Sequence, residues 1–170
     1  MSASLRLRTA AALGVALLLH LTLLSELRLA GVRPDVLLLV AAAAGLVGGP
    51  ARGAILGFAS GIAADLFLEA PFGLSALSYC LVGFAVGSLQ TGILRSAWWI
   101  PVLTAFAASV AGIVLYALLG ATVGQTEMVS PRLPLVAAVV GVMNGFLAPG
   151  SVRLIGWALG TRSAGRLYAA

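Results

Sequence analysis

The chain has few of the residues that enzyme and metal sites need. Charged residues make up 9% of its 170 residues, lysine is absent, and Cys80 and His20 are the only residues of their types. One cysteine excludes an internal disulfide bond, and one histidine leaves no metal-ligand cluster. No histidine or lysine is placed to activate a serine as a nucleophile, and no phosphate loop, CxxC motif or pair of catalytic carboxylates occurs. We therefore expect neither catalysis nor a cofactor or metal.

Apolar residues dominate what remains. The chain is 61% hydrophobic with a mean hydropathy of +1.11, whereas a soluble domain is roughly 45–50% apolar and about 25% charged. This composition predicts an all-α integral membrane protein, with residues 1–170 forming one membrane domain. All ten basic residues are arginine, which together with abundant Ala, Leu, Val and Gly indicates a GC-rich, bacterial genome.

Six apolar segments predict a bundle of six transmembrane helices, at residues 7–27, 35–47, 53–68, 73–94, 97–121 and 133–159. The second and third are short, reaching about 20 and 24 Å at about 1.5 Å per residue, whereas the hydrocarbon core is roughly 30 Å thick. Neighbouring helices must shield them, or the bilayer must thin around them. The sixth segment meets Pro149, where it either ends or kinks and continues to about Leu159, and we favour the kink.

The arginines predict a topology with both termini in the cytoplasm. Six spans place Arg6, Arg8, Arg52, Arg95, Arg153, Arg162 and Arg166 inside and Arg28, Arg33 and Arg132 outside. Such an excess is what the positive-inside rule requires. Arg52 and Arg95, with Trp98 and Trp99, are expected to anchor the cytoplasmic interface, because tryptophan is enriched at headgroup depth.

Residues 33–73 carry the most specific pattern. Asp35 follows Pro34 and can cap the helix that begins there. Asp65 lies near the outer end of the third segment, where a charged side chain is costly. One interpretation is a partner, ligand or proton site. The other is a carboxylate that faces the outer headgroups or binds N–H groups at the start of a nearby helix.

Three glycines in the third segment share one helix face. Gly53, Gly57 and Gly61 recur every four residues, a spacing that permits close approach of another helix. The sequence predicts a helix-packing face here, either within the chain or on a partner.

These features together resemble the rod shape-determining protein MreD family of bacteria. The resemblance rests on Pro34-Asp35, a Gly-Pro turn at Gly49-Pro50, Gly57 and Gly61 followed by Asp65, and Gly73-Leu74. The connector after Asp65 departs from the small or polar connector of the family, because here it is Phe67-Leu68-Glu69-Ala70-Pro71.

The resemblance implies a non-catalytic scaffold of the cell-elongation machinery in the bacterial cytoplasmic membrane. Its partner would be MreC, a single-span coiled-coil protein, and through it MreB and the glycan polymerase–transpeptidase pair; no nucleic acid is implied. The family's fold is similar to the substrate-binding subunit of energy-coupling-factor transporters. This leaves an alternative, a subunit that binds a vitamin-type solute in an outer cavity, with Ala12 and Ala16 as a docking motif.

Overall fold

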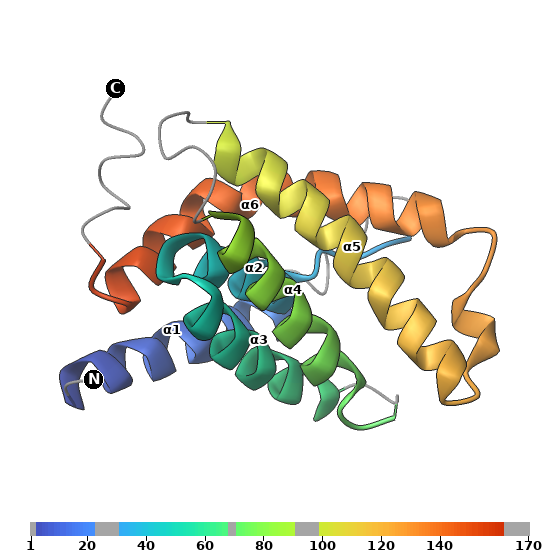
Figure 1. Cartoon of the computed structure of the whole chain (residues 1–170), viewed down its shortest axis with the longest axis horizontal. Helices are drawn as coiled ribbons and strands as arrows, with labels where there is room; N and C mark the ends of the chain where they lie inside the picture. Colours follow the sequence, from blue (N-terminus) through green and yellow to red (C-terminus); the bar gives the residue numbers. More distant parts are fainter. Residues whose placement is uncertain (1–2, 23–30, 68–70, 91–98, 162–170) are drawn as a thin grey trace.

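A computed structural model describes residues 3–22, 31–67, 71–90 and 99–161 (Figure 1). Within these ranges the fold is a bundle of six α-helices with one short 3₁₀ turn. The helices are α1 (Ala3–Leu21), α2 (Val36–Gly48), α3 (Pro50–Asp65), α4 (Leu74–Gln90), α5 (Ile100–Thr122) and α6 (Leu133–Ala158), and the turn η1 (Thr126–Met128) lies between α5 and α6.

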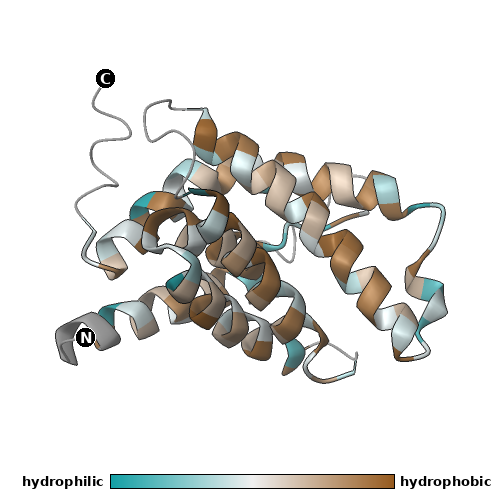
Figure 2. Cartoon of the chain, viewed as in Figure 1, coloured by the Kyte–Doolittle hydropathy of each residue, from teal (hydrophilic) through white to brown (hydrophobic). Residues whose placement is uncertain are grey.

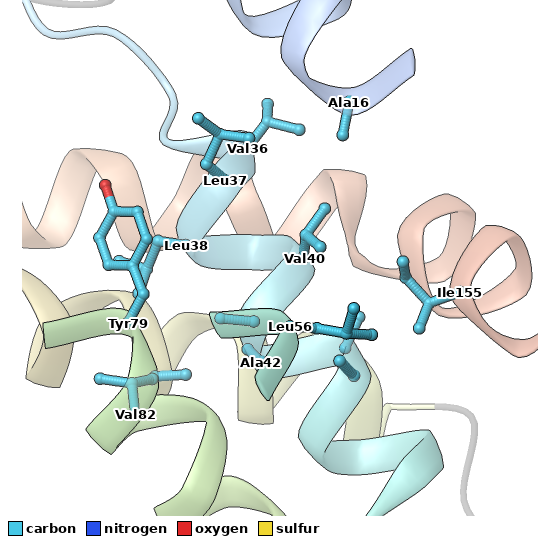
Figure 3. Packing of buried hydrophobic residues seen from close by; sticks show 14 of the residues in the cluster. Ala16, Val36, Leu37, Leu38, Val40, Ala42, Leu56, Tyr79, Val82 and Ile155 are labelled. Carbon is cyan, nitrogen blue, oxygen red and sulfur yellow. The ribbon is translucent and has the colours of Figure 1, made fainter. Parts of the chain in front are cut away.

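The short helix α2 forms the centre of the bundle. It contacts each of the other five helices, and every residue from Val36 to Gly45 is buried. Figure 3 shows its side chains meeting Ala16 of α1, Tyr79 of α4 and Ile155 of α6. Protein surrounds most of α2, so a helix of only 13 residues does not have to match the thickness of the bilayer.

The joint between α2 and α3 follows from three consecutive residues. Gly48 ends α2, Gly49 adopts a positive φ of 83° that favours glycine, and Pro50 begins α3. Proline suits the first position of a helix because its missing N–H would have no partner there. The chain therefore reverses direction without a loop.

Apolar residues recur along the helices of the bundle (Figure 2). Large hydrophobic side chains are exposed on five helices, and Phe146 on α6 is the most exposed at 83%. By length and composition, α5 and α6 are each sufficient to cross a membrane, and α2, α4 and residues 7–21 of α1 are shorter apolar helices. Such a surface is compatible with lipid rather than water.

Contacts between helix ends place the ends of the bundle. The guanidinium of Arg8, near the start of α1, lies 5.4 Å from the ring centroid of Trp157, near the end of α6. Arg52 and Leu159 both approach Gly48, at the end of α2. One end of the bundle therefore contains the start of α1, the α2–α3 joint and the end of α6. The start of α4 and the end of α3 lie at the other.

The helices coincide broadly with the expected segments. α6 continues through Pro149 to Ala158, as expected for a span that does not stop at the proline. The expected first, third, fourth and fifth segments extend in part into residues 23–30, 68–70 and 91–98, which lie outside the described residues.

Candidate functional site

The carboxylate of Asp65 caps the beginning of α4. It accepts hydrogen bonds from the backbone N–H groups of Gly73, Ser75 and Ala76, at 2.8, 3.1 and 3.3 Å. Asp65 is only 5% exposed, although it is the last residue of α3. The first N–H groups of a helix have no partner within the helix and carry a partial positive charge. The geometry therefore matches the second interpretation of Asp65, a carboxylate bound to N–H groups of a nearby helix.

Asp35 joins the start of α2 to α4. One carboxylate oxygen accepts a hydrogen bond from the backbone N–H of Leu38, at 3.0 Å, which is the geometry of a helix N-cap. The other accepts a hydrogen bond from the hydroxyl of Tyr79, which is buried on α4. The Asp35 side chain thus accepts a hydrogen bond from the N-terminus of the central helix α2 and also holds that helix beside α4.

Asn144 connects two further helices to the same point. Its side-chain amide donates hydrogen bonds of 2.9 Å to the backbone carbonyl of Asp35 and to the hydroxyl of Ser109 on α5. Asn144 is fully buried and lies near the middle of α6. The polar cluster of Asp35, Tyr79, Ser109 and Asn144 therefore links α2, α4, α5 and α6.

The glycine face of α3, formed by Gly53, Gly57 and Gly61, lies directly against α4. A Cβ atom added at any of the three would come within 3.0 Å of α4 backbone, at Gly83, Tyr79 and Ala76 respectively. The two antiparallel helices are therefore in direct backbone contact. Where Gly53 of α3 meets Gly83 of α4, both helices have a glycine. The face is occupied within the chain, so no further helix can pack on it.

Comparison with known proteins decides the family. The model of the rod shape-determining protein MreD matches residues 5–149, most of the chain. The chain belongs to the MreD family. No curated protein and no solved structure gives a significant match. As a member of the MreD family the chain is a non-catalytic, multi-pass membrane protein with a role in the rod-shape and cell-elongation machinery.

Five residues of the MreD pattern lie at the starts of α2 and α4, namely Pro34, Asp35, Asp65, Gly73 and Leu74. Pro34 is buried beside the α2 cap. Gly73 has a positive φ of 97° and donates its N–H to Asp65, and Leu74 is the buried first residue of α4. Each half of the motif thus places an aspartate at the N-terminus of a helix. Asp35 caps α2, which follows it directly, whereas Asp65 ends α3 and binds the start of α4 across the turn.

The expected interface anchors are described only in part. Arg52 lies in the first turn of α3 and is partly exposed. Trp99 is 48% exposed and immediately precedes α5. Arg95 and Trp98 lie outside the described residues.

Sequence reasoning missed Tyr79 and Asn144 as partners of Asp35. One signal was present, because Asn144 is the only asparagine in the chain and lies within a long apolar run. A polar side chain in such a run needs a hydrogen-bond partner within the protein. Its partner could not be identified, because Asp35 lies more than a hundred residues away in the chain.

Proposed function

We propose that this MreD-family chain is a scaffold of the bacterial cytoplasmic membrane that binds MreC. Through MreC it would be linked to MreB and to the glycan polymerase–transpeptidase pair of lateral wall synthesis. The observation that carries the proposal is that the buried polar side chains form hydrogen bonds between parts of the bundle. Asp35, Asp65 and Asn144 each bind another part of the bundle, and none is arranged to act on a substrate. Rigid positioning of helices is the property a scaffold requires.

The α3–α4 turn is the candidate contact surface. Leu66, Phe67 and Phe72 are exposed by 67%, 58% and 65% and flank this turn. Asp65 holds the turn by accepting the N–H of Gly73. Exposed aromatic side chains are suited to a protein contact, because aromatic residues are enriched at protein interfaces. This surface replaces the glycine face as a candidate contact, because α4 covers the glycines.

The proposed topology places both termini in the cytoplasm. Arg8 and Trp157 pair at one end of the bundle, and Arg52 lies at the same end, beside Gly48. Arg33 and Arg132 precede α2 and α6 at the opposite end. Arg6 near the start of α1 and Arg153 near the end of α6 bring the first end to four arginines against two. This excess supports its assignment to the cytoplasmic side.

The alternative of a vitamin-type solute-binding subunit has less support. Its expected docking motif, Ala12 and Ala16, is buried in the same hydrophobic cluster as Val36 and Val40 of α2 and is closed to another protein. Similarity to the substrate-binding subunit of energy-coupling-factor transporters stays a prediction, since no solved structure matches.

Co-purification tests the scaffold. The tagged chain would be extracted from its native membranes in a mild detergent, and the proteins bound to it identified. We expect a single-span coiled-coil protein in a stoichiometric amount, together with wall synthases. Recovery of ABC-type ATPases with a membrane coupling subunit would instead indicate solute transport.

Variants localise the contact. Phe72→Ala should lower recovery of the coiled-coil protein while the chain still inserts and folds, because Phe72 is exposed and contributes little to the core. Phe146→Ala is the matched control, since Phe146 is also exposed but lies on α6. Equal recovery with both variants would exclude the α3–α4 turn as the contact.

A further inference from the structure

One end of the bundle carries arginines, and the sequence places no acidic side chain in the segments that form it. The start of α1 and the end of α6 meet there (Figure 1), and Arg8 and Arg52 lie at this end. Residues 1–25, 36–64 and 128–170, which contain the start of α1, the α2–α3 joint and the end of α6, have no aspartate or glutamate. The side chains of this protein therefore offer these arginines no counter-charge, and an external anion would complement them.

Arg8 and Trp157 form an exposed corner between α1 and α6 at this end. The Arg8 guanidinium lies 5.4 Å from the centroid of the Trp157 ring, within the range of about 6 Å over which a cation is attracted to an aromatic face. Trp157 is 56% exposed, and Arg8 and its neighbour Leu7 are exposed as well. A guanidinium held over a ring keeps the N–H donors along its edge available for hydrogen bonds. The corner thus presents a positioned cation beside exposed apolar surface.

The chemistry of this corner fits the phosphate of a phospholipid. The planar fork of an arginine matches the oxygens of a phosphate group, with which it forms paired, charge-assisted hydrogen bonds. Trp157 is the penultimate residue of α6, and tryptophan prefers headgroup depth, where lipid phosphates are the surrounding anions. A phospholipid also supplies apolar methylene groups next to its phosphate, which match the exposed Leu7 and Trp157 side chains.

We propose that the corner formed by Arg8 and Trp157 binds the phosphate of an anionic membrane phospholipid. The guanidinium of Arg8 donates hydrogen bonds to the phosphate oxygens, and Leu7 and Trp157 contact the glycerol region and the first methylene groups. A bound lipid therefore contacts α1 and α6 together. This site is separate from the α3–α4 turn, and it depends neither on the identity of the protein partner nor on the side of the membrane that this end faces.

Fluorescence quenching tests the site. The full chain with Trp98→Phe and Trp99→Phe retains Trp157 as the single reporter. The purified protein in detergent would be titrated with phosphatidylglycerol and, separately, with phosphatidylcholine that carries the same brominated stearoyl chains. We expect tighter binding of phosphatidylglycerol, because the choline cation offsets the phosphate charge of the other lipid. Arg8→Gln should weaken binding of phosphatidylglycerol about fivefold, equivalent to about 1 kcal/mol, and leave phosphatidylcholine unchanged. Arg8→Lys retains the charge without the planar fork and should fall between.

Three controls keep the test decisive. Arg132→Gln removes an exposed arginine that precedes α6 at the opposite end and should leave both titrations unchanged. Added salt should weaken binding of phosphatidylglycerol more than that of phosphatidylcholine, and this comparison needs only the reporter chain if Arg8→Gln fails to fold. Inorganic phosphate should not compete with the lipid, and competition would assign the corner to a free anion and overturn the proposal. Equal affinity for the two lipids, or equal binding of phosphatidylglycerol with and without Arg8→Gln, would also overturn it.

Discussion

Replacing Asp65 by alanine tests the central structural assignment. The substitution removes the acceptor of three backbone N–H groups at the start of α4. Loss of an N-cap side chain costs about 0.5–2 kcal/mol, and a hydrogen bond to a charged group contributes about 1.5–3 kcal/mol. Loss of the buried carboxylate also removes its desolvation cost, so the three bonds do not add fully. We expect Asp65→Ala to lower the unfolding free energy by about 2–3 kcal/mol.

The assay is unfolding of the purified chain in a mild detergent, followed by circular dichroism. For a chain of this size, about 1 kcal/mol shifts the melting temperature by about 2–4 °C, so we expect a decrease of about 4–12 °C. Asp65→Asn retains one oxygen acceptor and should fall between alanine and the parent. Thr122→Ala, which removes an exposed hydroxyl bonded to its own helix, is the control and should change little. A parental melting temperature for Asp65→Ala would refute the capping role.

Three further substitutions test the packing and the polar cluster, with the same unfolding assay. Gly57→Ala should destabilise the fold by about 1–3 kcal/mol, because the new Cβ overlaps the Tyr79 carbonyl. The control Gly14→Ala meets no atom within 4 Å and should be neutral or stabilising. Equal effects of the two substitutions would contradict the close approach of α3 and α4. Tyr79→Phe removes the hydroxyl bonded to Asp35 and should cost about 0.5–1.5 kcal/mol, and no loss would show that this hydrogen bond does not stabilise the fold. Asn144→Leu leaves two acceptors without their donor and should cost about 1–3 kcal/mol, so a more stable leucine variant would contradict the linking role.

Much of the helical architecture could be predicted from local sequence. Apolar runs separated by Gly-Pro joints and arginines indicate helices of limited length, because each backbone polar group in lipid must be satisfied within a helix. The cap by Asp35 was also predictable, since an aspartate after proline at the start of an apolar run has one obvious set of N–H donors. These features depend on residues within one turn of each other.

The arrangement of the helices around α2 could not be predicted in the same way. Hydropathy assigns all six segments to the membrane but does not say which of them lipid touches. A short apolar segment such as α2 has the same hydropathy whether lipid or protein surrounds it. Its burial arises from contacts with five helices spread over the chain, and so do the bonds from Tyr79 and Asn144 to Asp35. Long-range partners of this kind leave no local pattern.

The α3–α4 pair shows why glycine and aspartate carry the structural information in this chain. In lipid, apolar side chains gain little by meeting each other, so close packing and hydrogen bonds decide which helices pair. Moving along α3 from Gly53 through Gly57 to Gly61, the crossing points on α4 move back from Gly83 to Tyr79 to Ala76. Asp65 continues the series by binding the N–H groups that open α4. The glycine face and the aspartate therefore specify one register between two helices, and a slip of one residue would bring side chains into the glycine contacts and move the N–H groups away from Asp65.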